Sequence, residues 1–330
     1  MVFQPTYQFH LIPEQDYLNQ IPVIEQELQN YAIHGRFSSF DGCKLDYELY
    51  LAKKSHATII IIHGLSEFYK KYYEMTWYFI NMGYNVLLFD QRGHGLSDRD
   101  IEGLSLIHVK QFDDYVKDLD CIIQQLVLPS CPDVPVYLFA HSMGGAVAGL
   151  YLAYNSKMVK RAVLSSPMIC PYAYGVPIPI VKLKTLSCKR KDGWTGRFPY
   201  SSDFNPNVKL EHASDISYAR FRHNLDYRIG NPLYRTSAMT NQWMWEAIQM
   251  QHRLLSAKVT NAIQADVLLL NAGKDNAVRM RPQQWFAKKV KTCTYYTFPE
   301  SKHSIYTASD DILEEYYRMI FRFLEGDSYD

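Results

Sequence analysis

A serine flanked by small residues follows a short apolar run near the middle of the chain. Residues 136–145 have the sequence VYLFAHSMGG, in which Ala140 lies two residues before Ser142 and Gly144 two residues after it. Small residues at these positions let a strand turn directly into a helix and raise the serine above the sheet, an arrangement known as the nucleophile elbow. The first small residue is usually glycine, and Ala140 adds one methyl group. The pattern predicts a serine that attacks an acyl carbonyl, and an ordinary helix-capping serine is the alternative.

Such a serine needs a histidine that accepts its proton and a carboxylate that orients the histidine. In proteins with a nucleophile elbow, the acid and then the histidine follow the serine along the chain, on loops after later strands. Asp275 follows the apolar run Val267–Leu270, and His303 follows the run Thr294–Phe298. We therefore predict a catalytic triad of Ser142, Asp275 and His303.

Other residues compete for these roles. Asp266 begins the predicted strand that Asp275 follows, so it lies at the wrong end, and Glu300 is on the loop of the histidine itself. Asp275 could instead only stabilise a turn, and His303 could be a solvated loop residue. His141 is next to the serine, but a residue at that place in an elbow points away from it, so we expect it to pack.

Hydrolysis of an acyl group also needs an oxyanion hole, made by two backbone N–H groups that face the developing negative charge. One is expected from Met143, the residue after the serine. The second is expected from Leu65, because the run Thr58–Ile62 leads into His63-Gly64 and glycine allows the backbone to turn sharply. The alternative is that His63-Gly64 forms a plain turn.

Short apolar runs alternate with helical periodicity from Gly35 onward, which is typical of a mostly parallel sheet wrapped by helices. Two further segments, Arg36–Phe40 and Leu45–Ala52, alternate apolar and polar residues around Asp41-Gly42 and predict an antiparallel hairpin. We expect an α/β architecture of about eight strands with helices on both faces. The continuous apolar runs predicted as buried strands are Thr58–Ile62, Asn85–Phe89, Val136–Phe139, Arg161–Ser165, Val267–Leu270 and Thr294–Phe298.

The connection between the sixth and seventh predicted strands is far longer than the others. Crossovers in such sheets need a few tens of residues, so we predict a helical cap inserted after the sixth strand, over 168–264. The α/β core then comprises 35–167 and 265–330, and residues 1–34 form an N-terminal extension. The cap begins with the apolar, proline-rich stretch Met168–Val181, expected to line the site or to face a membrane. A basic cluster follows, at Lys182, Lys184, Lys189, Arg190, Lys191 and Arg197.

Composition excludes several classes of protein. The 330 residues carry 35 Lys and Arg against 34 Asp and Glu, and 47% are apolar. A disordered chain would have fewer apolar residues and a larger net charge, and a dedicated nucleic-acid binder would have an overall positive charge. The six scattered cysteines favour reduced thiols and no metal site, and a disulfide framework or a zinc site is the alternative. Because no signal peptide or membrane-spanning run is apparent, we expect a cytoplasmic protein whose cap would touch the inner face of a membrane.

Several motifs resemble the α/β-hydrolase superfamily, and more narrowly its monoacylglycerol lipase and lysophospholipase branch. They are Gly64 with Glu67, the stretch 83–97 that contains Asp90, Arg92, Gly93 and Gly95, and the stretch 140–145. Residues 112–118, Ser166-Pro-Met168 and 220–225 are similar to bacterial lysophospholipases of the PldB type. The resemblance spans roughly 35–324 and implies the triad Ser142, Asp275 and His303. The loop that contains Asp90 and Arg92 is interpreted as structural.

This resemblance implies a serine hydrolase that needs no cofactor and cleaves the ester of a lysophospholipid or a monoacylglycerol. A lysophospholipase is the main hypothesis, and a monoacylglycerol lipase or generalist carboxylesterase is the second. A non-catalytic hydrolase-fold binding protein, and an aminopeptidase or a hydrolase of C–C bonds, are remote alternatives. Arg220 and Arg222 are expected to bind a phosphate head group, with a structural ion pair as the alternative.

Overall fold

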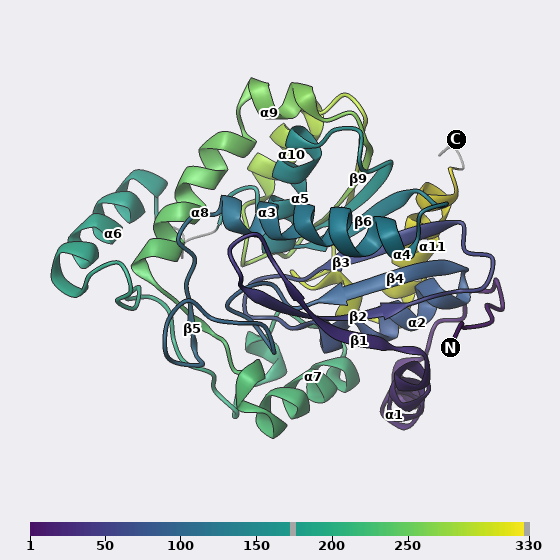
Figure 1. Ribbon diagram of the computed structural model, residues 1–330. Helices are drawn as coiled ribbons and strands as arrows, with labels where there is room; N and C mark the ends of the chain where they lie inside the picture. Colours follow the sequence, from purple (N-terminus) through teal and green to yellow (C-terminus); the bar gives the residue numbers. More distant parts are fainter. Residues whose placement is uncertain (172–175, 327–330) are drawn as a thin grey trace.

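Eight strands form one mostly parallel sheet in the structure, a computed structural model that describes residues 1–171 and 176–326. The strands lie in the order β1-β2-β4-β3-β6-β7-β9-β10 (Figure 1). β1 pairs with β2, and β2 with β4, in antiparallel fashion, and all later pairs are parallel. The α/β-hydrolase architecture and the antiparallel hairpin are thereby confirmed. The strands of this sheet span Ile33–Ser38 (β1), Lys44–Tyr50 (β2), Ala57–Ile62 (β3), Tyr84–Phe89 (β4), Val136–His141 (β6), Arg161–Ser165 (β7), Asp266–Ala272 (β9) and Cys293–Phe298 (β10).

Helices cover both faces of the sheet because both faces are apolar. Alternate residues of a strand point to opposite faces, so Ile60 and Ile62 of β3 join one buried cluster while Ile59 and Ile61 join the other. The first cluster is covered by α3 (Asp113–Ile122), α5 (Met143–Tyr154) and α10 (Met280–Lys289). The second is covered by α1 (Glu14–Tyr31), α2 (Tyr73–Asn81) and α11 (Asp310–Glu325). Shorter helical segments are η1 (Tyr69–Tyr72), the π-helical η2 (Ile123–Val127), α4 (Leu128–Ser130) and η6 (Ile305–Thr307).

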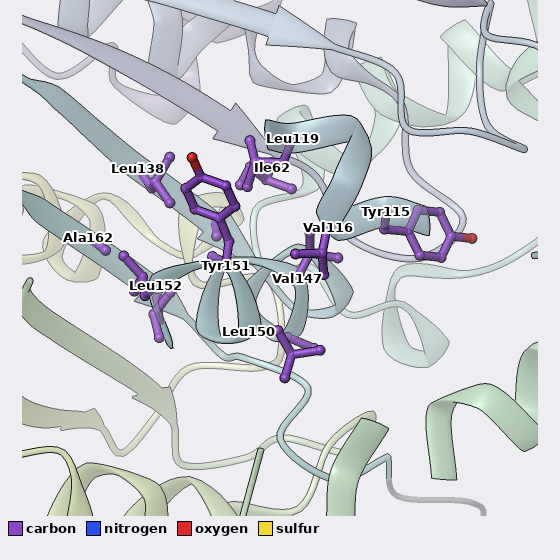
Figure 2. Close-up of a cluster of buried hydrophobic side chains, with 14 of the residues drawn as sticks. Ile62, Tyr115, Val116, Leu119, Leu138, Val147, Leu150, Tyr151, Leu152 and Ala162 are labelled. Atoms are coloured by element: carbon purple, nitrogen blue, oxygen red, sulfur yellow. The ribbon is translucent and has the colours of Figure 1, made fainter. Parts of the chain in front are cut away.

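Helix α5 lies at the centre of the first cluster. All residues from Met143 to Leu152 are buried, and Figure 2 shows side chains of α5 packed with those of α3 and of the strands beneath, for example Val147, Val116 and Ile62. A helix buried on nearly all sides cannot shift without loss of packing. The start of α5, directly after Ser142, is therefore held firmly against the sheet.

The long segment between β7 and β9 is mostly helical and lies beyond the carboxyl ends of the strands (Figure 1). A two-stranded sheet joins it to the rest of the chain, because β5 (Leu106–Ile107) pairs with β8 (Ala238–Met239) in parallel. We interpret residues 168–264 as the inserted cap. Residues 172–175, which fall in the proline-rich stretch expected to line the site, lie outside the described residues. The segment contains α6 (Ile178–Asp192), η4 (Leu210–His212), α7 (Tyr218–Gly230), η5 (Pro232–Tyr234), α8 (Asn241–Leu254) and α9 (Ala257–Ala262).

The N-terminal residues pack against both parts of the chain. α1 lies against α2 and α7, and its first residue makes two bonds that fix it. The Glu14 backbone N–H donates to the Asp310 carboxylate at 2.9 Å, and the Glu14 side chain accepts from the backbone N–H of Tyr218 at 2.8 Å. α1 thus connects the start of α11 with the start of α7. The division of the chain that treats residues 1–34 as a separate N-terminal extension stays an interpretation.

The loop after β4 is held by buried charges, in agreement with its interpretation as structural. Arg92 is buried and donates to both oxygens of Asp118, at 2.6 and 2.7 Å, and to Asp41 at 2.9 Å. Asp90 accepts the backbone N–H groups of Tyr69 and Leu96. Because paired, hydrogen-bonded charges are the form in which charges are tolerated inside proteins, this loop fixes the neighbouring strands.

Candidate active site

Ser142 lies on a sharp turn between β6 and α5, as the elbow motif predicts. Its φ angle is +51°, which is costly for a residue with a side chain. A Cβ atom on Gly144 would overlap the Ile62 carbonyl oxygen, and one on Gly145 would overlap Pro167. Only glycine therefore allows the start of α5 to approach β3 and the segment after β7 this closely. Ala140 is fully buried in β6, where its methyl group is accommodated.

The side chains of Ser142, His303 and Asp275 form one continuous line of hydrogen bonds. His303 Nε2 lies 2.9 Å from Ser142 Oγ, and His303 Nδ1 lies 2.7 Å from Asp275 Oδ2. The other carboxylate oxygen, Oδ1, accepts the backbone N–H groups of Ala277 and Val278 at 2.8 and 3.0 Å. Asp275 thus also stabilises its own turn, and this turn aims the second oxygen at the histidine. Since Asp275 can only accept, it holds the His303 proton on Nδ1 and leaves Nε2 free to accept the serine proton.

The competing acids lie elsewhere. Asp266 is at the opposite end of β9, half-exposed and 4.0 Å from Arg161. Glu300 is exposed and pairs with Lys274. Neither carboxylate contacts His303 in the described part of the chain, so of the three candidate acids Asp275 is the one that meets the histidine.

The backbone groups predicted for the oxyanion hole belong to Met143, which follows Ser142 directly, and to Leu65 on the turn after β3. A Cβ atom on Gly64 would lie 3.1 Å from Ser142 Cβ, so the turn after β3 runs directly against the serine. Leu65, the next residue, lines the cavity at the serine. The His63 ring fixes this turn because it bonds the Gly64 carbonyl oxygen at 2.7 Å and accepts the backbone N–H of Gln91 at 3.0 Å. The roles of Leu65 and Met143 as donors to an oxyanion stay a prediction.

A buried carboxylate behind this turn was not predicted from the sequence. Glu67 Oε2 accepts the Gly64 N–H at 2.7 Å and the Tyr72 hydroxyl at 2.6 Å, and Oε1 accepts from Lys71 at 2.7 Å and from the Tyr306 hydroxyl at 2.6 Å. Burial would raise the pKa of Glu67, but the Lys71 ammonium and these hydrogen bonds hold that pKa well below its usual range. Glu67 is thus an anion that fixes the Gly64 backbone. The only signal in the sequence was its place in the resembling motif.

His141 packs, as predicted, but it packs against the active site. Its Nδ1 bonds the Ser165 carbonyl oxygen at 3.1 Å, and its ring lies 4.8 Å from the His303 ring and 5.1 Å from the Tyr306 ring. Burial lowers the pKa of His141 to about 3, so the ring is neutral at physiological pH. A neutral ring here supports one side of His303 without repelling the positive charge that His303 acquires during catalysis.

A cavity of about 480 Å³ opens at Ser142 and His303, both of which line it. This volume lies in the range of roughly 300–1,000 Å³ that is typical of small-molecule sites. Within residues 1–171 and 176–326, no group of three or more His, Cys, Asp or Glu side chains is arranged to hold a metal ion. Because apolar side chains line much of the cavity, it can take an apolar chain beside the serine. Its apolar wall includes Met168, Phe221, Leu225, Met239, Trp243 and Met244.

Arg220 and Arg222 do not line this cavity, and the prediction that they bind a head group is wrong. Arg220 is buried and donates to Glu74 of α2 at 2.7 Å and to the Ile12 carbonyl oxygen at 2.8 Å. Arg222 is exposed and pairs with Asp226, one turn further along α7, at 2.7 Å. Both side chains leave α7 on faces other than the one that meets the cavity, and the structural ion pair describes them.

Comparisons with known proteins show the family of the chain. A family model described as serine aminopeptidase, S33, matches residues 53–310. Lysophospholipase L2 of Escherichia coli (strain K12) is 28% identical over 265 residues, which cover 76% of this chain and 73% of that protein. Monoglyceride lipase of Mus musculus is 32% identical over 115 residues, 34% of this chain and 35% of that protein.

Among solved structures, a soluble variant of monoglyceride lipase from Saccharomyces cerevisiae, in complex with a substrate analog, superposes with a TM-score of 0.71. The match covers 91% of this chain and 96% of that one at 18% identity. A likeness at this identity supports the fold alone.

Proposed function

The chain belongs to the serine aminopeptidase S33 family of hydrolases, and from this premise we propose that it hydrolyses the carboxylic ester of a single-chain lipid, most specifically a lysophospholipid. The observation that carries this proposal is the unbroken line of hydrogen bonds from Ser142 through His303 to Asp275 at an apolar-walled cavity. Lysophospholipase L2 of Escherichia coli covers most of the chain, whereas the monoglyceride lipase of Mus musculus covers a third of it, which favours a lysophospholipid over a monoacylglycerol.

The proposed reaction has two steps. His303 Nε2 takes the proton of Ser142 Oγ as the serine attacks the ester carbonyl, and Asp275 stabilises the resulting imidazolium. The negative oxygen is held by the backbone N–H groups of Leu65 and Met143, each worth about 2.7–4 kcal/mol in the transition state. His303 then protonates the leaving glycerol oxygen. In the second step it activates a water molecule, which releases the fatty acid from Ser142.

A panel of substrates with one acyl chain tests this function. We expect the purified protein to release fatty acid from lysophosphatidylethanolamine or lysophosphatidylcholine with a higher kcat/KM than from the matching monoacylglycerol. The comparison should include short p-nitrophenyl esters and an amino-acid anilide, which report on a generalist esterase and an aminopeptidase. A higher kcat/KM for monoacylglycerol would replace the main hypothesis by a monoacylglycerol lipase, and cleavage of the anilide alone would exclude a lipid ester hydrolase.

We further propose that helix α6 of the cap contacts an anionic membrane surface. Figure 1 shows α6 projecting from the rest of the molecule, and its outward side chains include Ile180 and Leu183, which are 54% and 69% exposed. Exposed apolar side chains flanked by cations are typical of helices that lie on anionic lipid. No helix in the described part of the chain is both long and apolar enough to span a bilayer. α6 contains one acidic residue, Asp192, and five basic residues, Lys182, Lys184, Lys189, Arg190 and Lys191.

Replacing Ile180 and Leu183 together by aspartate is expected to weaken binding to vesicles that contain anionic lipid by about tenfold or more. Each side chain buried in lipid contributes roughly 1.5–3 kcal/mol, and the new charges also repel the surface. Sedimentation with phosphatidylglycerol-containing vesicles measures the effect, and pure phosphatidylcholine vesicles test the role of charge. The matched control replaces Leu18 and Val23, two exposed apolar residues of α1. If the variant at Ile180 and Leu183 binds these vesicles as well as the control variant at Leu18 and Val23, α6 is excluded as the contact.

A further inference from the structure

One face of α7 forms part of the cavity wall and ends in a cation. Phe221, Asn224, Leu225 and Arg228 all line the cavity, and their spacing of three, four and seven residues places them on one side of a helix. The two arginines near the start of α7 lie off this face. Arg228 is thus the arginine of α7 that meets the substrate cavity.

Arg228 is held by neutral groups only. Its Nε donates to the Tyr234 carbonyl oxygen at 3.1 Å, and its Nη2 donates to the Thr236 carbonyl oxygen at 3.0 Å and to Ser237 Oγ at 2.8 Å. Its guanidinium also lies 4.5 Å from the centre of the Phe204 ring. No carboxylate forms an ion pair with it in the described part of the chain. Its Nη1 hydrogens, which have no acceptor there, remain for a ligand.

Arg228 keeps its charge in this setting. Burial lowers the pKa of Arg228 to about 10, and the nearby Glu67 opposes this shift. The side chain is therefore positive at physiological pH, and an anion in the cavity would meet a partly buried cation that lacks a carboxylate partner. Arginine binds phosphate oxygens well because its planar fork can donate two parallel hydrogen bonds.

The same cavity carries an anion, Asp215, on the segment before α7. Asp215 is 8% exposed and lines the cavity, and its Oδ1 has no hydrogen-bond partner in the described residues. The Ser304 backbone N–H donates to the Ser214 carbonyl oxygen at 3.1 Å, so this segment runs beside the loop of His303. A buried carboxylate oxygen without a donor is costly, and the N–H groups of a primary ammonium, such as that of an ethanolamine head group, would satisfy it.

Lys71 lines the same cavity and interacts with both charges. Burial would lower the pKa of Lys71, but Glu67 and Asp215 raise it, and Arg228 opposes them. All three charges therefore act on Lys71, which is itself neutralised by the Glu67 carboxylate at 2.7 Å. Because Glu67 neutralises Lys71, the charges left to recognise a ligand are the positive one of Arg228 and the negative one of Asp215.

We propose that Arg228 and Asp215 form a head-group site in which Arg228 binds the phosphate, and Asp215 the terminal ammonium, of a zwitterionic lysophospholipid. This inference rests on the proposed function, since it assumes that the acyl ester lies at Ser142. It explains how one cavity could prefer an ethanolamine or choline head group over the bare glycerol of a monoacylglycerol. Both residues are positioned by backbone contacts that exist before any ligand binds.

Replacing Arg228 by glutamine is expected to lower the ratio of kcat/KM for lysophosphatidylethanolamine to that for the matching monoacylglycerol by about tenfold or more, the size of a lost hydrogen-bonded charge pair. Arg222→Ala, on the same helix but outside the cavity, is the matched control and should leave the ratio unchanged. Arg228→Lys, which keeps the charge without the fork, should recover part of the loss. If Arg228 only supports residues 234–237, the variant will lower both activities equally together with the melting temperature, and the inference fails.

Replacing Asp215 by asparagine tests the ammonium separately. We expect the preference for lysophosphatidylethanolamine over lysophosphatidylglycerol, which has the phosphate but no ammonium, to fall by about fivefold or more. An unchanged preference would remove Asp215 from the site.

A binding measurement separates this inference from the proposed function. Calorimetry of the Ser142→Ala variant with a short-chain lysophosphatidylcholine, below its micelle concentration, reports on the head-group site without any reaction. If the wild-type protein hydrolyses no lipid ester, but Arg228→Gln still weakens binding to the Ser142→Ala variant about tenfold or more, the site is retained and the function is rejected. If the wild-type protein hydrolyses lysophospholipid, but neither Arg228→Gln nor Asp215→Asn changes binding, the function is retained and the site is rejected.

Discussion

Replacing Ser142 by alanine is expected to lower the kcat for lysophospholipid hydrolysis by about 10⁶-fold, the scale seen when a serine hydrolase loses its nucleophile. The only hydroxyl that His303 Nε2 contacts in the described residues is that of Ser142, at 2.9 Å, so no other group can form the acyl-enzyme. The variant should also lose all labelling by a fluorophosphonate probe, which reacts with activated serines. Fatty-acid release and in-gel fluorescence measure the two effects.

Ser166 provides the matched control for this experiment. It is buried, has a positive φ angle like Ser142, and follows the neighbouring strand β7. Its hydroxyl has no hydrogen-bond partner in the described residues, so it is not activated. Ser166→Ala should keep both labelling and turnover. Labelling that survives in Ser142→Ala and disappears in another serine variant would relocate the nucleophile, and a wild-type protein that is never labelled would favour the non-catalytic hypothesis.

The sheet and the three central side chains could be predicted because each depends on local pattern. Every strand predicted from its apolar residues is present, and the loops at the ends of β6, β9 and β10 carry Ser142, Asp275 and His303. Parallel strands bring their carboxyl ends to one edge of the sheet, so chain order was sufficient to group these residues. The family match and the curated relatives confirm the resemblance to the lysophospholipase and monoacylglycerol lipase branch.

The surroundings of the triad could not be predicted, because they depend on contacts between distant segments. Glu67 meets Tyr306, which is 239 positions further along the chain, and no periodicity relates the two. The basic cluster is visible in the sequence but its conformation is not, and the structure places its residues from Lys182 to Lys191 in the helix α6. The pairing of β5 with β8 involves two residues on each side, too few to leave a pattern in the sequence.

The arginines of α7 show where a prediction from residue type fails. The prediction for Arg220 and Arg222 rests on their charge and on their place in a resembling motif. A helix turns by about 100° per residue, so neighbouring positions face different surroundings. Arg220 meets Glu74 and Arg222 meets Asp226, while Arg228 meets the cavity. Which face of α7 is turned toward Ser142 is decided by how the segment 168–264 packs on the sheet. That packing is tertiary information.

Replacing Asp275 by asparagine is expected to lower kcat by about 10⁴-fold with little change in stability, because the substitution reverses one hydrogen bond. Asp275 Oδ1 accepts two backbone N–H groups, so the asparagine carbonyl oxygen takes that place and its NH₂ group faces His303 Nδ1. An NH₂ group only donates. His303 must then carry its proton on Nε2, where it can no longer accept the proton of Ser142. Steady-state kinetics and the rate of fluorophosphonate labelling should fall together, while the melting temperature stays close to that of the wild type.

Glu300→Gln is the matched control for this argument, since Glu300 is the acid on the loop of His303 and pairs with Lys274 at the surface. The same change of carboxylate to amide should there alter kcat by no more than about twofold, as expected for an exposed ion pair. Asp275→Ala should lose the support of the turn as well as the activity, and its melting temperature should drop below that of Asp275→Asn. If Asp275→Asn retained more than a tenth of the wild-type kcat, the orientation of His303 would have to come from another group, and the assignment of Asp275 as the acid of the triad would be withdrawn.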